Sequence, residues 1–275
     1  TPYQIVVDSV EDHESKYHDV INNFESLDNL PVVVGTLHSM LTPFVASYKR
    51  NNPDKKIAYI MTDGAALPLY LSMNVKNLKQ KGLIDSTITI GNAFGGDYEC
   101  INIYTGLITA KEIAKADVVF VSMGPGIAGT GTKYGFTGIE QGQILDAVKK
   151  LGGNPIAIPR ISFADKRDRH QGISHHSITV FDKIVNVDVN IPITIYESQK
   201  LNKIKEQIKE NKLDEKHNII FIENNKCKED LEYFGLKVKS MGRNYDEDSE
   251  FFDSASSAAY YLMEVCHDWE RKYCK

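Results

Sequence analysis

The stretch from Arg160 to His176 combines guanidinium and imidazole side chains at high density. Its reactive residues are Arg160, Arg167, Arg169, His170, His175 and His176. Arginine suits bidentate recognition of phosphate or carboxylate, and histidine transfers protons near neutral pH or binds a metal. Residues adjacent or five apart do not share a face of a regular helix, so we expect a loop, with a lid as one form of it. The competing interpretation is a solvated charged loop.

A glycine-rich segment forms a second region where a ligand could bind. It reads Met-Gly-Pro-Gly-Ile-Ala-Gly-Thr-Gly-Thr from Met123 to Thr132. Glycine lets the backbone approach a ligand closely, and successive N–H groups in such a loop form an anion-binding concavity. The candidates for anion binding here are Gly124, Gly126, Gly129, Thr130, Gly131 and Thr132, with Tyr134 and Glu140 as secondary candidates. A tight connection without a ligand is the alternative.

The glycine-rich segment matches two nucleotide-binding templates only in part. Gly124, Gly126 and Gly129 have the spacing of the dinucleotide fingerprint, but no apolar helix start follows them. The phosphate-loop template fails because Thr132 occupies its lysine position. The spacing therefore leaves a nucleotide-binding module open and excludes a standard nucleoside-triphosphate loop.

Further polar residues follow other strand-like runs. His38 and Asp63 are candidate bases or partners of a base, and the candidate binding residues are Ser39, Gly95, Gly96, Asp97 and Arg160. Asp63 and Asp97 equally suit helix capping. A mixed nitrogen and oxygen metal site from His38, the aspartates and the histidines near 175 is an alternative, although no local ligand pair supports it. Cys100, expected to open a helix, is interpreted as a packing residue, with a nucleophile as the alternative.

Short strands rich in valine and isoleucine precede these clusters. We predict strands over Val32–Val34, Ile57–Met61, Thr87–Ile90, Val118–Met123 and Ile156–Ile158. We predict helices between them over Ser39–Asn51, Ala65–Lys81, Tyr98–Lys115 and Ile139–Leu151. This alternation indicates an α/β fold: a three-layer, mainly parallel, Rossmann-like sheet with helices on both faces. The clusters would then meet at the carboxyl edge of the sheet, where such folds bind ligands.

The domain boundaries follow from the same pattern. Residues 1–29 are expected to be an N-terminal edge segment, with a strand over Gln4–Val10, and residues 30–275 a single α/β domain. A smaller C-terminal lobe over 196–245 is an alternative. The second half is predicted to hold strands over Ile184–Ile195, Asn218–Glu223 and Lys237–Met241, and helices over Lys200–Lys212, Glu229–Phe234 and Ser249–Trp269.

Composition limits the classes of partner. The net charge of -5 gives no support for nucleic-acid binding, and no apolar run approaches the roughly 20 residues that span a bilayer. The cysteines form no C-x-x-C pair, and cytosolic proteins rarely carry disulfides. We therefore expect a cytoplasmic protein that binds a small anionic molecule, without nucleic acid or membrane partners; a homo-oligomer remains open.

The assembled motifs resemble an uncharacterised bacterial family that is classed as a domain of unknown function. They are Val33–Leu41, Met61–Gly64, Ala93–Asp97, Met123–Gly126, Gly129–Gly142, Pro159–Asp165 and Ser174–His176. Members of that family look longer at the N-terminus, so the resemblance implies that a β-rich region precedes Thr1 in the natural protein. The resemblance implies a site but no reaction, cofactor or metal.

The leading hypothesis is an enzyme that acts on a small phosphorylated or carboxylated substrate. The glycine loop and the arginines would hold the anion, and His170, His175 or His176 would move protons. Hydrolysis, elimination and group transfer all remain open. The alternatives are a non-catalytic nucleotide or dinucleotide sensor and a metal-dependent hydrolase.

Overall fold

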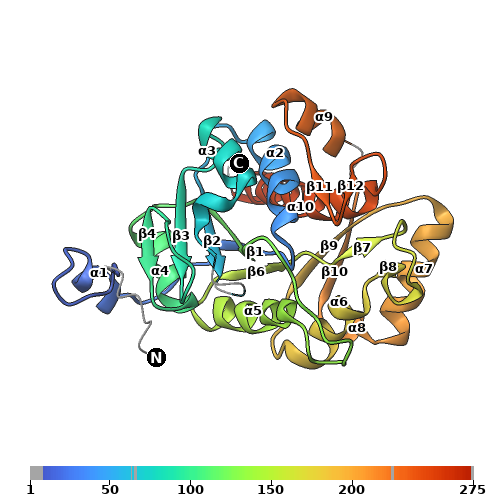
Figure 1. Ribbon diagram of the computed structural model, residues 1–275, viewed down its shortest axis with the longest axis horizontal. Helices are drawn as coiled ribbons and strands as arrows, with labels where there is room; N and C mark the ends of the chain where they lie inside the picture. The colour runs from blue at the N-terminus through green and yellow to red at the C-terminus, as the bar shows by residue number, and fades with distance from the viewer. Residues whose placement is uncertain (1–8, 63, 65–66, 224–225, 274–275) are drawn as a thin grey trace.

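A computed structural model describes residues 9–62, 64, 67–223 and 226–273. Its centre is an eight-stranded sheet in the order β10-β9-β6-β1-β5-β2-β3-β4, and every neighbouring pair is parallel (Figure 1). The strands are β1 Pro31–Val34, β2 Ile57–Thr62, β3 Ser86–Ile90, β4 Tyr98–Cys100, β5 Val118–Met123, β6 Asn154–Ala157, β9 Asn190–Thr194 and β10 Asn218–Ile222. Two short antiparallel ribbons pair β7 Ile161–Ser162 with β8 Gly172–Ile173, and β11 Lys239–Ser240 with β12 Arg243–Asn244.

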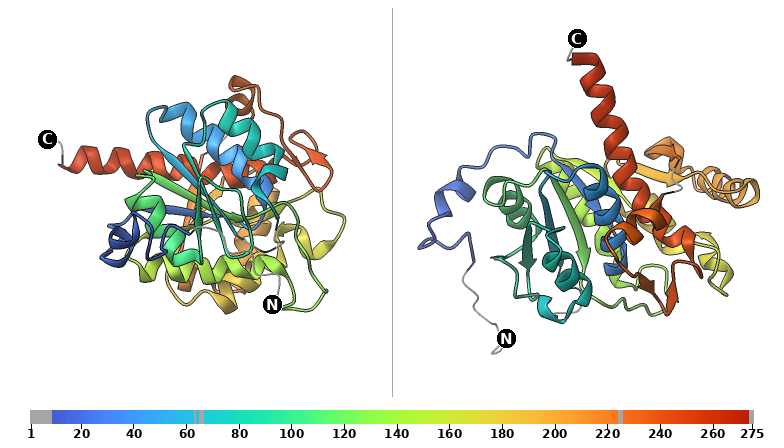
Figure 2. Two further views of the ribbon diagram at one scale, coloured as in Figure 1. Left: turned by 60° about the vertical axis from the view of Figure 1, so that its left-hand side comes forward. Right: turned by 90° about the horizontal axis from the view of Figure 1, so that it is seen from above.

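Helices cover both faces of this sheet. One layer holds α2 Leu41–Asn51, α3 Met73–Gln80, α9 Cys227–Tyr233 and α10 Ser249–Tyr273. The other holds α4 Ile103–Glu112, α5 Glu140–Lys150, α6 His175–Thr179, α7 Ser198–Glu210 and α8 Leu213–Lys216, while α1 His18–Asn22 lies beside α4. The C-terminal part of α10 projects beyond the rest of the molecule (Figure 2). None of the described helices combines the length and apolar character that a membrane span needs.

The apolar strands are explained by burial on both faces. Successive side chains of a strand point to opposite faces, and Val33 packs into the core under α2 and α10 while Val32 and Val34 pack into the core under α4 and α5. A strand buried on both sides needs apolar residues at every position. The predicted three-layer α/β sheet is therefore confirmed.

The structure corrects several predicted boundaries. The helix predicted over Tyr98–Lys115 is wrong at its start, because Tyr98–Cys100 forms the edge strand β4. Asn102 then caps α4 by accepting hydrogen bonds from the backbone N–H groups of Tyr104 and Thr105. Cys100 thus ends a strand, and burial raises the pKa of its thiol to about 12, which suits a packing residue.

The helix predicted over Ala65–Lys81 begins only at Met73, where the Ser72 side chain caps it by accepting a hydrogen bond from the N–H of Val75. The strand predicted over Ile184–Ile195 begins only at Asn190, because residues 180–184 form a π-helical turn that continues α6. The predicted loop after Arg160 contains the β7–β8 ribbon and α6, so the adjacent histidines open a short helix.

At the N-terminal end, most of the strand predicted over Gln4–Val10 lies outside the described residues, but the N–H of Val10 donates to the carbonyl of Glu99 in β4. In the segment 196–245, β10 extends the main sheet, whereas the β11–β12 ribbon lies outside it. The division into an edge segment, one domain and a smaller lobe stays a prediction.

The connections from β1 and β5 leave on opposite faces of the sheet. These two strands are neighbours; β1 leads to α2 in one helix layer and β5 leads to α5 in the other. Such a reversal opens a crevice outside the carboxyl ends of the two strands, which is where open α/β sheets bind ligands. The fold therefore places one site position between the residues that follow Val34 and those that follow Met123.

Replacement of Gly142 by alanine should destabilise α5. A Cβ at this position would lie 2.6 Å from Cγ2 of Ile184. Overpacking of this kind costs about 1–3 kcal/mol, and the upper part of this range applies because the new Cβ would also lie 3.0 Å from Cβ of Ile184. This cost exceeds the gain of about 1 kcal/mol for alanine in a helix. We expect a net loss of about 1–2 kcal/mol in urea unfolding, while Gln143→Ala on the exposed face of the same helix leaves the free energy of unfolding unchanged. An unaltered midpoint for Gly142→Ala would contradict this packing.

Candidate functional site

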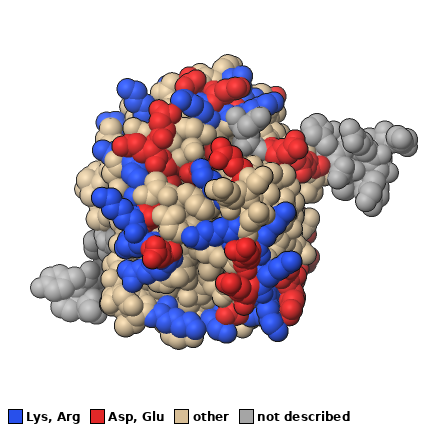
Figure 3. Space-filling view, turned by 90° about the vertical axis from the view of Figure 1, so that its right-hand side faces the viewer, with Lys and Arg blue, Asp and Glu red and all other residues tan. Residues whose placement is uncertain are grey.

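A cavity of about 250 Å³ lies beyond the carboxyl ends of β5 and β6, and is called the basic cavity below. It is lined by Ile127, Ala128, Gly129, Gly131, Arg160, Arg167, Arg169, His170, His176 and Met241. The structure thus brings together the two segments that the sequence singled out, the glycine loop and the arginine–histidine stretch. On the face of the molecule that carries α7, basic and acidic side chains are intermingled (Figure 3).

A single buried carboxylate organises the arginines. Asp165 accepts from Nη2 of the buried Arg160 at 3.1 Å, and from Nε and Nη2 of Arg167 at 3.0 and 2.9 Å. Hydrogen bonding to Arg167 is the main cause that holds the pKa of Asp165 well below its usual range. Because Asp165 offsets one charge among three arginines, the cavity retains positive charge. Within the described part of the chain, Arg169 has no carboxylate partner.

His170 is held neutral by its contacts. Its Nδ1 lies 3.2 Å from Nη1 of Arg160 and 2.7 Å from Oγ of Ser174. A guanidinium can only donate, so Nδ1 is an acceptor and the ring proton is on Nε2. Burial, followed by the charges of Arg160 and Arg167, lowers the pKa of His170 to about 3. His170 therefore offers a fixed N–H rather than a titrating base.

His176 is the histidine best placed to exchange a proton in the cavity. Its ring stacks on Phe136 at a centroid distance of 4.1 Å and an angle of 11°. No protein group among the described residues bonds its ring nitrogens. Burial, followed by the neighbouring His175 and Arg160, lowers the pKa of His176 to about 4, so the ring is neutral at pH 7.

His175 completes a cluster of three imidazoles. Its ring centroid lies 4.1 Å from that of His176 and 4.9 Å from that of His170. Its Nε2 is buried without a hydrogen-bond partner, and burial and Arg169 lower its pKa. His175 does not line the basic cavity, so it touches the cavity only through the other two rings.

A second cavity, of about 370 Å³, adjoins the first and is called the neutral cavity. Its lining is Leu37, His38, Ser39, Asn74, Pro125, Gly126, Ile127, Lys239, Ser240 and Met241. It lies at the crevice between the ends of β1 and β5. The two cavities share Ile127 and Met241, so these side chains separate them.

His38 forms part of the wall of the neutral cavity. Its Nδ1 lies 3.0 Å from the hydroxyl of Tyr59 and its Nε2 lies 2.6 Å from Oγ of Ser72. Burial lowers the pKa of His38 to about 4. With both nitrogens engaged by protein groups, His38 is a neutral structural element rather than an available base. Ser39 donates its hydroxyl to Ser240 at 2.9 Å and is likewise engaged.

Met241 stands at the tip of the β11–β12 hairpin. Met241 and Gly242 both have positive φ, 49° and 86°, as in the two-residue turn that suits a β-hairpin. The sulfur of Met241 lies 3.2 Å from Nη2 of Arg160. The strand predicted over Lys237–Met241 therefore ends at Ser240, because the turn begins there.

The glycine loop contributes fewer residues to the site than the sequence suggests. Gly126, Gly129 and Gly131 line the cavities, whereas Gly124 packs against the side chain of Met61. Thr130 and Thr132 close an exposed turn through hydrogen bonds with the backbone of Gly135 at 2.7 and 3.1 Å. Tyr134 is exposed and lines neither cavity. Glu140 accepts a hydrogen bond from the hydroxyl of Thr62 at 2.6 Å. The helix starts only at Glu140, which departs from the dinucleotide fingerprint.

Asp97, Gly95 and Gly96 lie away from both cavities. Because β4 runs parallel to β3, the connecting loop must return towards the start of β3, and it carries these residues with it. Asp97 pairs with Lys79 at 2.6 Å and accepts from the N–H of Thr87 at 2.8 Å. Asp63 lies outside the described residues.

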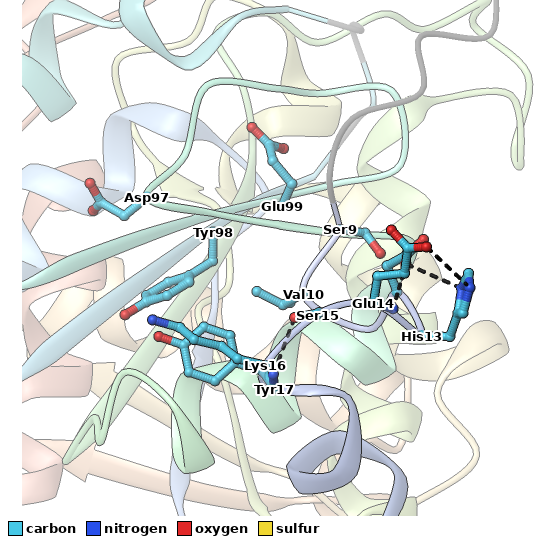
Figure 4. A pocket seen from close by; sticks show the side chains of 11 residues that line it. Ser9, Val10, His13, Glu14, Ser15, Lys16, Tyr17, Asp97, Tyr98 and Glu99 are labelled. Atoms are coloured by element: carbon cyan, nitrogen blue, oxygen red, sulfur yellow. Dashed lines mark hydrogen bonds and ion pairs between the residues drawn. The ribbon is translucent and has the colours of Figure 1, made fainter.

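Asp97 lines a different cavity, of about 770 Å³, between β4 and the N-terminal segment. Its walls are Ser9, Val10, Asp12, His13, Glu14, Ser15, Lys16, Tyr17, Asp97, Tyr98 and Glu99. The Tyr17 and Tyr98 rings meet edge to face at 6.4 Å (Figure 4). Its four carboxylates against one lysine make it unsuited to an anion. No group of three histidine, cysteine, aspartate or glutamate side chains in the described residues is arranged for a metal ion.

Sequence reasoning missed Ile127, Met241, Ser240, Lys239 and Asn74. Met241 and Gly242 between two short polar runs carry a hairpin signal, since glycine is the common second residue of such turns. Nothing in the local sequence indicates that this hairpin reaches over the ends of β1 and β6.

The sequence model of the family described as "Protein of unknown function (DUF3866)" matches residues 1–259. No curated protein and no solved structure matches this chain.

Proposed function

As this chain belongs to the DUF3866 family of unknown function, we propose from the geometry of the basic cavity that it is an enzyme acting on a small phosphorylated or carboxylated molecule. The observation that carries the proposal is the convergence of Arg160, Arg167 and Arg169 with His176 on one cavity. Guanidinium groups recognise such anions through paired hydrogen bonds, and a neutral imidazole beside them can transfer a proton.

Each arginine has a distinct part in this proposal. Arg160 is buried and immobilised by Asp165, so it presents a fixed donor at the base of the cavity. Arg167 shares the same carboxylate from the rim. Arg169 is exposed and can close over a bound anion. A preorganised site of this kind binds well because little ordering remains to be done on binding.

His176 is the proposed proton carrier. An anion among the arginines would offset their charges, which are among the causes that depress the pKa of His176. The pKa of His176, which burial lowers most, would then rise in part, so that substrate binding itself would favour a general acid or base. Hydrolysis, elimination and group transfer each use such a group. The proposal extends to a cytoplasmic location, with neither nucleic acid nor membrane as a partner.

Substitution of Arg169 should weaken the binding of inorganic phosphate at least about tenfold. A hydrogen bond to a charged group contributes about 1.5–3 kcal/mol, and 1.4 kcal/mol corresponds to a factor of ten. We expect this loss in isothermal titration calorimetry of Arg169→Gln. The matched control is Lys166→Gln, which removes an exposed charge that does not line the cavity. If both variants lose the same phosphate affinity, the loss reflects only the lower net charge of the protein, and the proposed anion site is refuted.

The proposed proton transfer by His176 requires a separate measurement of turnover. Wild type, His176→Gln and the surface control His13→Gln would be screened against phosphomonoesters and small carboxylates. If His176 transfers the proton, His176→Gln loses turnover but retains phosphate affinity, and His13→Gln behaves as wild type. Unchanged turnover in His176→Gln would remove it from the mechanism.

A further inference from the structure

We propose that the neutral cavity receives an uncharged, flat heterocyclic ring attached to the anion, so that the substrate is a phosphorylated heterocycle of the mononucleotide type. The inference rests on the proposed anion site and names the class of molecule that this site accepts. Nothing in the basic cavity alone distinguishes a nucleotide from any other small phosphate, so the inference stands on the adjoining cavity.

The first support is position. The neutral cavity lies where the connections after β1 and β5 diverge, with Leu37, His38 and Ser39 on one side and Pro125, Gly126 and Ile127 on the other. This crevice is the position where open α/β sheets bind ligands. Since Ile127 and Met241 border both cavities, a molecule can place its anion in one and its body in the other.

The second support is the chemistry of the lining. Leu37, Pro125, Ile127 and Met241 offer aliphatic surfaces that suit the faces of a flat ring. The amide of Asn74 offers a donor and an acceptor, which is the pair that an amide uses to recognise the edge of a base. These groups match a heterocycle that is apolar on its faces and polar at its edge.

The third support is charge. Lys239 is the one ionised side chain among the described residues that line the neutral cavity, and no carboxylate is among them. His38 is neutral, with both nitrogens bound to protein hydroxyls. The lining therefore disfavours a cationic body, and its single lysine can donate to an acceptor atom of an uncharged ring. It also lacks carboxylates that could accept from the hydroxyl groups of a sugar.

Met241 is the proposed specificity residue between the two subsites. Its left-handed backbone, with φ of 49°, is unfavourable for a residue with a side chain. Asparagine or glycine would be the usual occupant of such a turn. The strained methionine keeps a polarisable side chain against Arg160 and on the wall of both cavities, where it can pack on a ring.

The test compares inorganic phosphate, ribose 5-phosphate, AMP and UMP by isothermal titration calorimetry on the full chain. We expect AMP or UMP to bind at least tenfold more tightly than ribose 5-phosphate. In Asn74→Phe, which fills the neutral cavity, that preference should fall to within twofold while phosphate affinity stays at the wild-type value. Lys76→Phe, on the exposed surface of the same helix, is the matched control and should keep the preference.

A second variant separates a binding role from folding. Met241→Asn suits the hairpin turn at least as well as methionine, so its melting temperature should not fall, yet the nucleotide preference should shrink at least threefold. Equal binding of ribose 5-phosphate and both nucleotides to the wild type, with phosphate binding that depends on Arg169, would overturn this inference and leave the anion site standing. Absence of phosphate binding to the wild type would instead overturn the proposed function.

Discussion

Replacement of Arg160 by methionine is expected to abolish phosphate binding and to lower the free energy of unfolding by about 3 kcal/mol. Removing one partner of a buried ion pair costs about 3–5 kcal/mol, because the other charge stays buried without compensation. The lower end applies here, since Asp165 keeps its three hydrogen bonds to Arg167. The Nδ1 of His170 also loses its contact with Arg160 and keeps the one with the hydroxyl of Ser174. Urea unfolding and phosphate titration measure the two effects.

Two comparisons separate stability from binding. In Arg160→Met combined with Asp165→Leu, neither charge is left buried, so part of the stability should return while phosphate binding stays lost. Arg167→Gln removes a guanidinium whose side chain is 52% exposed, and exposed pairs contribute about 1 kcal/mol or less. If the double variant is no more stable than Arg160→Met, the buried carboxylate of Asp165 without Arg160 is not the cause of the lower free energy of unfolding.

Acidification from pH 7 to pH 5 is expected to destabilise the protein through its buried histidines. An unfolded histidine takes up a proton near pH 6.5, whereas burial lowers the pKa of folded His38 to about 4 and of folded His170 to about 3. The unfolded state therefore binds more protons in this window, so stability is present above pH 6.5 and is lost as the pH falls. Each group accounts for about 2 kcal/mol between pH 7 and pH 5 by linkage.

Carboxyls whose pKa is raised by burial act in the opposite direction; they are Asp230, Asp248 and Asp253. Burial raises the pKa of Asp253 to about 6, so the folded state gains a proton as the pH falls from 7 to 5. This gain amounts to about 1 kcal/mol by the same linkage, which is less than the combined loss from the two histidines. The net expectation is a protein that is less stable at pH 5 than at pH 7.

Urea unfolding at pH 7 and pH 5 would measure the effect in wild type, His38→Gln, His170→Gln and the exposed control His13→Gln. Each buried substitution should reduce the difference between the two pH values, and Asp253→Asn should enlarge it. His13, with a side chain 80% exposed, should leave it unchanged. A difference between the two pH values that is the same in wild type, His38→Gln and His170→Gln would show that these imidazoles titrate normally in the folded protein.

Local sequence patterns were sufficient to predict the frame of the site. Runs of valine and isoleucine at β1, β2 and β5 predict parallel strands, because a strand covered on both faces needs apolar residues at successive positions. The density of arginine and histidine after β6 predicts the basic cavity. Both properties are local, so no knowledge of long-range contacts was required.

The roles of individual residues in the site depended on contacts between distant parts of the chain. His38 and Asp97 carried the same local signal, yet His38 is bound by Tyr59 and Ser72 in a cavity wall and Asp97 lies by Lys79 at another cavity. The difference arises because β4 adds to the edge of the sheet in parallel, which makes the preceding loop turn back. A sequence pattern contains no measure of that pairing.

The sequence by itself therefore determined an α/β sheet whose carboxyl edge carries glycines, arginines and histidines, since helical and strand periodicity and residue chemistry are short-range properties. Only the tertiary structure decided that Asp165 bonds two arginines, that His176 lines the basic cavity, and that Met241 lines both cavities. Met241 meets Arg160 across 81 residues, and Ser240 meets Ser39 across 201. Such contacts result from how α10 and the β11–β12 hairpin pack against the sheet, and packing is a property of the whole chain.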